Sequence, residues 1–213
     1  MIKAVIFDMD GVLIDTEPLS DQYYFEVFKK KGIEATIEDF ELLRGSNHNA
    51  FWGHFSEKYS IPHPSSEEKQ KIREGFVGFL QTKSPKPFPG LLKFIEGLKK
   101  KKIKLALGSS ASNYRIGQQL KLLKLTNYFK TIVSGEEVTH GKPYPEIYIK
   151  SAQKLGVSPK ECLAVEDAKA GVESAKRAGM KVLGFKSEGN NQNLSQADLI
   201  IKSFEEITVE DII

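Results

Sequence analysis

The chain has 213 residues, of which 40% are apolar, and its formal net charge is +3. The single cysteine, Cys162, excludes an intrachain disulfide, and no stretch approaches the roughly 18 apolar residues that a membrane span needs. The N-terminal residues also lack a basic region followed by an apolar stretch of signal length. We therefore expect a cytoplasmic protein that binds neither membrane nor nucleic acid.

The first predicted element is a strand over residues 2–7 that runs directly into acidic residues. Asp8 and Asp10 are two positions apart, so on an extended backbone both side chains project from one face at the carboxyl end of the strand. Gly11 then allows the chain to turn away. Carboxylates beside buried apolar side chains are costly unless something pairs with them, so this pattern favours a divalent-cation site or a nucleophile beside an acid/base.

Residues 17–85 change to a helical pattern. The spacing of Tyr23, Tyr24 and Phe28 predicts an amphipathic first helix. Further helical stretches are expected near residues 39–43, 49–59 and 67–80. A proline-rich connector at residues 84–90 ends this segment, which we interpret as a small helical cap domain inserted after the first strand.

From residue 91 onward, helices and strands are expected to alternate. The predicted helices cover residues 91–101, 113–123, 145–155 and 168–178. The predicted strands cover residues 103–107, 131–134, 161–165, 181–184 and 199–201. This alternation predicts an α/β fold with a doubly wound, Rossmann-like parallel sheet. We interpret the lysine run at residues 99–102 as a solvated helix end rather than a nucleic-acid surface.

The expected organisation is therefore an α/β core domain made of residues 1–16 and 86–213, with residues 17–85 as the cap. Ligands of such sheets bind outside the carboxyl ends of the strands. An insert after the first strand would lie over that edge, where it would act as a lid.

Polar side chains follow several of the predicted strands. Gly108, Ser109 and Ser110 follow the strand at 103–107, Lys142 precedes a helix, and Glu166 and Asp167 follow the strand at 161–165. Each feature alone is more often a turn, a surface lysine or a helix cap. Together they form a set suited to phosphoryl transfer, in which acids hold a hard cation, a hydroxyl and backbone N–H groups bind phosphate oxygens, and a lysine neutralises charge.

In these motifs the chain resembles the haloacid dehalogenase superfamily of aspartate-nucleophile phosphotransferases. It is similar to the branch with a small helical cap that contains β-phosphoglucomutase and many sugar-phosphate phosphatases. The resemblance covers nearly the whole chain. The segments that carry it are residues 5–13, 107–110, 141–148 and 165–168.

The resemblance implies a mechanism for these residues. Asp8 would attack phosphorus and form an aspartyl-phosphate. Asp10 would protonate the leaving oxygen and then activate water. Ser109 would hold the phosphoryl group, and Lys142 would pair with Asp8. Mg²⁺ would be held by Asp8, the Asp10 backbone carbonyl and Asp167, with Glu166 as a ligand directly or through water. An aspartate at position 10 favours phosphoryl chemistry over dehalogenation.

The resemblance also separates two reactions. A mutase grips a second phosphate with an arginine from the cap and a Ser-Lys pair, and this chain has His48, Ala111 and Ser112 at those positions. Because both cations are missing, we favour a phosphatase that hydrolyses small phosphorylated metabolites, sugar phosphates among them. β-Phosphoglucomutase is the alternative, with Lys142, Lys169 or Arg44 as a substitute cation. A non-catalytic metabolite-binding module on the same fold is a third interpretation.

Substrate specificity is expected to lie in the cap. Arg44 and His48 follow a predicted helix and are candidates to contact the substrate, as are Ser109 and Ser110 in the core. Thr16 lies where the cap begins and is a candidate hinge. We expect a monomer whose partner is a small phosphorylated metabolite and whose cofactor is Mg²⁺.

Overall fold

The computed structural model describes residues 1–43 and 48–213. The chain divides into two compact units: the α/β unit, residues 1–15 and 85–213, and the helical unit, residues 16–84. Within the described residues, no helix is both long enough and apolar enough to span a bilayer.

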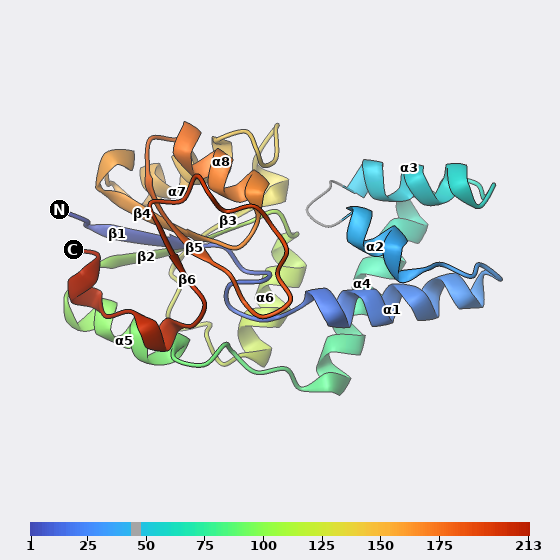
Figure 1. The fold of residues 1–213 in the computed structure, drawn as a ribbon, viewed down its shortest axis with the longest axis horizontal. Helices are drawn as coiled ribbons and strands as arrows, with labels where there is room; N and C mark the ends of the chain where they lie inside the picture. Colours follow the sequence, from blue (N-terminus) through green and yellow to red (C-terminus); the bar gives the residue numbers. More distant parts are fainter. Residues whose placement is uncertain (44–47) are drawn as a thin grey trace. The chain divides into compact units, whose positions relative to one another are not determined.

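The α/β unit is built around one parallel sheet of six strands in the order β3-β2-β1-β4-β5-β6 (Figure 1). The strands are β1 (Ala4–Phe7), β2 (Lys104–Ser109), β3 (Thr131–Ser134), β4 (Cys162–Glu166), β5 (Lys181–Phe185) and β6 (Leu199–Ile201). The helices are α5 (Leu91–Lys100), α6 (Asn113–Leu122), α7 (Glu146–Leu155) and α8 (Lys169–Arg177). Short 3₁₀ turns lie at Gly135–Glu137, Pro159–Glu161, Phe204–Glu206 and Val209–Asp211.

Both faces of the sheet are covered by helices, which confirms the predicted doubly wound architecture. Val5 and Phe7 of β1 pack in the apolar cluster that includes α5 and α6, whereas Ala4 and Ile6 pack in the cluster that includes α7 and α8. Successive side chains of a strand point to opposite faces, so a strand covered on both sides must be apolar throughout. All residues of β1 are indeed buried.

The strand order places the acidic ends of β1 and β4 side by side at the centre of the sheet. Phe7 pairs with Val165 of β4 on one side and with Leu107 of β2 on the other. Strand β2 continues to Ser109, two residues beyond the predicted end, because Gly108 and Ser109 still pair with Val133 and Ser134 of β3. Ser109 is therefore held in the sheet rather than in a turn.

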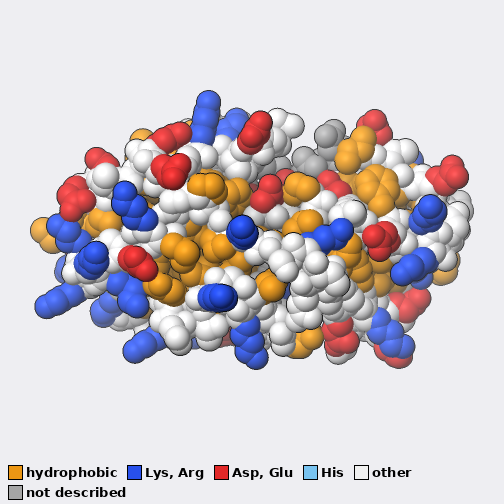
Figure 2. Space-filling model, turned by 90° about the horizontal axis from the view of Figure 1, so that it is seen from below, with side chains coloured by type: hydrophobic (Ala, Val, Ile, Leu, Met, Phe, Trp, Pro, Cys, Tyr) orange, Lys and Arg blue, Asp and Glu red, His pale blue; other side chains and the backbone are white. Residues whose placement is uncertain are grey.

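The lysine run lies at the end of α5. Lys99 and Lys100 occupy the last helical turn, Lys99 lies over the Tyr128 ring at 4.6 Å, and Lys101 pairs with Glu210 at 2.9 Å. On the face shown in Figure 2, lysine and arginine side chains stand singly or in small groups among acidic, apolar and uncharged ones. The arrangement of the run matches the interpretation as a helix end.

The helical unit contains α1 (Glu17–Lys30), α2 (Ile37–Leu43), α3 (His48–Lys58) and α4 (Ser66–Lys83). Its core is aromatic: Phe28, Phe40, Trp52 and Phe55 are buried together, and Phe28 stacks on Phe55 with ring centroids 4.1 Å apart. Such ring pairs add to the stabilisation that apolar burial provides. Ser65 begins α4 with a capping box to Glu68.

Asp39 is a buried carboxylate that ties the helical unit together. It accepts hydrogen bonds from His54 Nε2 at 2.8 Å, Tyr59 OH at 2.6 Å and Lys58 Nζ at 2.5 Å, as well as from the backbone N–H of Thr36. Burial alone would raise the pKa of Asp39, but these donors outweigh it and hold the pKa well below its usual range.

Candidate active site

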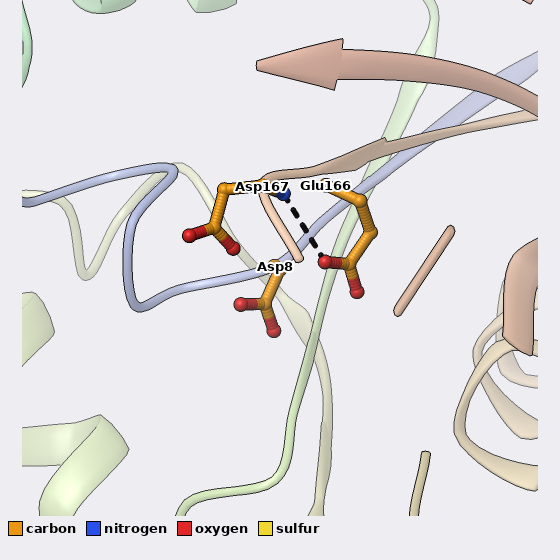
Figure 3. A group of neighbouring side chains, drawn as sticks. All are labelled: Asp8, Glu166 and Asp167. Atoms are coloured by element: carbon orange, nitrogen blue, oxygen red, sulfur yellow. Dashed lines mark hydrogen bonds between the residues drawn. The ribbon is translucent and has the colours of Figure 1, made fainter. Parts of the chain in front are cut away.

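Three carboxylates gather at the carboxyl ends of β1 and β4. Asp8 follows β1 directly, Glu166 is the last residue of β4, and Asp167 is the next residue. One oxygen from each lies within 4.8 Å of the other two, and all three residues are buried. Figure 3 shows their carboxyl groups on the same side of the strand ends, with the backbone N–H of Asp167 donating to Glu166 Oε2 at 3.2 Å.

Lys142 bridges two of these carboxylates. Its Nζ lies 2.6 Å from Asp8 Oδ1 and 2.5 Å from Glu166 Oε1, and it also donates to the Gly108 carbonyl at 3.3 Å. The lysine side chain is only 10% exposed. Burial alone would lower the pKa of Lys142, but the two carboxylates outweigh it and raise the pKa, so the ammonium is charged.

Negative charge is concentrated at this site. Burial raises the pKa of Asp8 to about 7 although Lys142 opposes it, and the charge of Glu166 adds to the rise. Among the described residues, these three buried carboxylates lie close together and Lys142 pairs with two of them. Clustered carboxylate oxygens are the ligands that hard divalent cations prefer. The donor set of Asp8, Glu166 and Asp167 therefore fits Mg²⁺.

Gly11 is required for the close approach of the β1 loop to this cluster. Its φ is +73°, and a Cβ at this position would lie 1.9 Å from Asp167 Oδ2. Any side chain here would strain the backbone and displace the carboxylate. The turn that follows is fixed by hydrogen bonds from Gly11 N to the Ile14 carbonyl and from Leu13 N to the Met9 carbonyl.

Two residues that the sequence analysis did not single out support the acids. Tyr148 of α7 donates its hydroxyl to Glu166 Oε1 at 2.5 Å, and Asn190 donates its amide to the Asp167 carbonyl at 2.8 Å. Burial and the neighbouring Glu166 raise the pKa of Tyr148 well above its usual range, so it remains a donor. Both contacts join residues far apart in the chain, and local spacing carries no signal for them.

Asp10, two residues after Asp8, accepts hydrogen bonds from helix α6. Its Oδ1 accepts from Arg115 Nη2 at 2.6 Å and from Gln119 Nε2 at 3.4 Å, both on α6. The sequence analysis did not single out either residue. A lone arginine on an amphipathic helix is usually solvated, so this contact is visible only in the folded chain.

The remaining predicted residues lie in both units. Ser109 is 1% exposed at the end of β2, and its Oγ accepts from Ala111 N at 3.1 Å, whereas Ser110 is exposed. Thr16 is a buried residue of the helical unit, next to the start of α1. Arg44 lies outside the described residues. His48 is the first residue of α3, and its side chain also lies outside what the structure describes.

Residues 5–185 match the family of haloacid dehalogenase-like hydrolases. A phosphorylated carbohydrates phosphatase from Thermotoga maritima is 36% identical, over 84% of this chain and 83% of its own. Protein SUPPRESSOR OF QUENCHING 1, chloroplastic, from Arabidopsis thaliana is 33% identical over all of this chain, which spans only 21% of that relative. The crystal structure of β-phosphoglucomutase from Clostridium difficile superposes with a TM-score of 0.81 at 30% identity, covering 100% of this chain and 96% of the other.

Proposed function

Because the chain belongs to the haloacid dehalogenase-like hydrolases, we propose that it is a Mg²⁺-dependent phosphatase of small phosphorylated metabolites, sugar phosphates among them. The observation that carries the proposal is the buried cluster of Asp8, Glu166 and Asp167 around Lys142. It offers a nucleophile, a fixed cation and oxygen ligands for a metal at the edge of the sheet where ligands bind.

Asp8 is the nucleophile of this reaction. In the first step one of its oxygens attacks phosphorus, and the bond between phosphorus and the leaving oxygen breaks. Lys142 holds Asp8 Oδ1 at 2.6 Å, which directs the carboxylate and neutralises charge on the transferring group. Asp10 gives a proton to the leaving oxygen and later takes one from the attacking water. Ser109, at the neighbouring strand end, binds the phosphoryl oxygens.

Mg²⁺ would be held by Asp8, Asp167 and the Asp10 backbone carbonyl, with Glu166 as a ligand directly or through water, and it would supply positive charge between nucleophile and phosphate. Substrate selection belongs to residues 17–85 in this proposal. Arg44 and His48 of that segment are proposed contacts, as are Thr16, which directly precedes it, and Ser110 of the α/β unit.

Similarity to the Thermotoga phosphorylated carbohydrates phosphatase supports hydrolysis of phosphorylated carbohydrates. The test is phosphate release from a panel of phosphorylated metabolites with Mg²⁺, comparing the wild type with Asp8→Asn. Asp8→Asn is expected to abolish turnover while remaining folded. Glu188→Gln, which removes one exposed carboxylate elsewhere in the α/β unit, is the matched control and should retain full activity. Turnover by Asp8→Asn would contradict the mechanism.

β-Phosphoglucomutase is the second candidate, and similarity to the Clostridium enzyme favours it. It is tested with β-glucose 1-phosphate and a trace of the bisphosphate. A mutase converts the substrate to glucose 6-phosphate, whereas a phosphatase releases inorganic phosphate. Absence of both products, together with no hydrolysis of p-nitrophenyl phosphate or acetyl phosphate, would favour a non-catalytic metabolite-binding module instead.

A further inference from the structure

The side chain of Asp10 is held by two donors from one helix. Arg115 and Gln119 are one turn apart on α6, so both side chains lie on the same face of the helix. Both donate to the same carboxylate oxygen, Oδ1, at 2.6 Å and 3.4 Å. A carboxylate on a loop is free to rotate about its side-chain torsions, and two donors on a rigid helix restrict that rotation.

The helix that carries these donors is itself anchored. The Ser112 hydroxyl accepts from Arg115 N and caps the first turn, and the Glu136 carboxylate accepts from both the backbone and side-chain nitrogens of Asn113. Gln119 is 1% exposed. Burying an amide is costly unless it is hydrogen-bonded, so a glutamine at this buried position is suited to a polar partner such as Asp10.

We propose that Arg115, assisted by Gln119, is a positioning residue for the acid/base Asp10. This inference rests on the proposed function and assigns to Arg115 the orientation of the carboxyl group that transfers the protons.

The two chemical steps use the Asp10 carboxyl group in opposite directions. In the first step the Asp8 oxygen–phosphorus bond forms, the ester bond breaks, and the proton of the Asp10 carboxyl group moves to the leaving oxygen. In the second step a water proton moves to the Asp10 carboxylate as the water oxygen bonds to phosphorus and the Asp8 oxygen–phosphorus bond breaks. Arg115 touches neither the phosphate nor the leaving group in this scheme.

The experiment compares two leaving groups. p-Nitrophenolate departs without a proton, whereas the sugar alkoxide of glucose 6-phosphate needs one. Arg115→Met removes the guanidinium donor, and Lys121→Met removes one cation from an exposed position on the same helix as a matched control. Stopped-flow release of p-nitrophenol and steady-state release of phosphate separate the two steps.

For Arg115→Met we expect kcat on glucose 6-phosphate to fall about a hundredfold with KM changed by less than about twofold, since a misplaced catalytic group costs this much. With p-nitrophenyl phosphate we expect a burst of about one equivalent followed by slow turnover, because Asp8 still attacks but water activation is impaired. Arg115→Lys should recover part of the loss, and Gln119→Met should show the same pattern more weakly.

Three outcomes overturn the inference. The first is a kcat for Arg115→Met within about threefold of that of the Lys121→Met control, because misplacing an acid/base should lower kcat by much more than this. The second is an equal loss on both substrates with no burst, which indicates damage to the Asp8 site. The third outcome is an inactive wild type, which overturns the proposed function itself. If Arg115→Met fails to fold, the same criteria are applied to Gln119→Met.

Discussion

Replacing Gly171 by alanine should stabilise helix α8 but displace the carboxylate of Glu166 in the acidic cluster, so the variant shows which of the two effects is larger. Gly171 lies in α8, and a Cβ there would come within 2.0 Å of Glu166 Oε1. The carboxylate has no room to retreat without losing partners, because Oε1 accepts from Lys142 and Tyr148 and Oε2 accepts from Asp167 N. The substitution therefore breaks a buried charge pair even though it adds only a methyl group.

The magnitude follows from two opposing effects. Alanine gains about 1 kcal/mol over glycine in a helix interior. Breaking a buried ion pair costs about 3–5 kcal/mol. We expect Gly171→Ala to lower the free energy of unfolding by about 3 kcal/mol. Gly117→Ala is the matched control, since Gly117 lies inside α6 and a Cβ there meets no atom within 4 Å. That variant should gain about 0.5–1 kcal/mol.

The assay is urea unfolding followed by far-ultraviolet circular dichroism, with phosphate release measured on the same preparations. Gly171→Ala should lose stability and turnover together, whereas Gly117→Ala should lose neither. If Gly171→Ala is as stable and as active as Gly117→Ala, the packing of Glu166 against α8 does not hold the cluster together, and the reasoning is refuted.

Three other predictions concern the helical unit, the support of Glu166 and the metal. Asp39→Asn should lower the unfolding free energy reported by Trp52 fluorescence by about 2 kcal/mol at pH 7. Because the pKa of Asp39 is depressed in the folded state, the difference in unfolding free energy between variant and wild type should shrink as the pH falls below about 4. An equal difference at pH 7 and below about pH 4 would contradict this prediction. Tyr148→Phe removes the donor to Glu166 Oε1 and should cost about 2 kcal/mol in urea unfolding; unchanged stability would exclude a supporting role. Mg²⁺ should raise the unfolding free energy of the wild type but not of Asp167→Asn, and EDTA should reverse the gain; an equal gain in both proteins would count against Asp167 as a ligand.

The α/β fold could be predicted because its signals are local. Unbroken apolar runs such as residues 4–7 and 162–165 are typical of strands buried on both faces, and the intervening helices carry apolar faces of helical period. Parallel strands bring their carboxyl ends to one edge, so the approach of Asp8 to Glu166 and Asp167 follows from topology alone. The sequence predicts the end of β2 two residues too early, because glycine and serine are typical of a turn, whereas pairing with β3 extends the strand to Ser109.

Contacts between distant residues could not be predicted in this way. Arg115 reaches Asp10 across 105 positions, and Asn190 reaches Asp167 across 23. The packing of its apolar face sets how each helix is rotated about its axis, and so which way its polar side chains point. The local sequence around a polar residue therefore does not indicate which distant residue it contacts. The same holds for Gly171, whose need for a small side chain arises from the buried carboxylate of Glu166.

The charge balance of the cluster connects its stability with its chemistry. A buried ion pair contributes little net stability, and the carboxylates in excess of Lys142 are a cost to the fold. Burial raises the pKa of Asp8 to about 7, which disfavours the ionised form that the proposed nucleophile needs in order to react. A phosphate substrate adds negative charge and makes the imbalance worse. In the proposed mechanism, additional positive charge beside the carboxylates favours the ionised nucleophile and the bound phosphate together, which is the reason that a divalent cation suits this donor set.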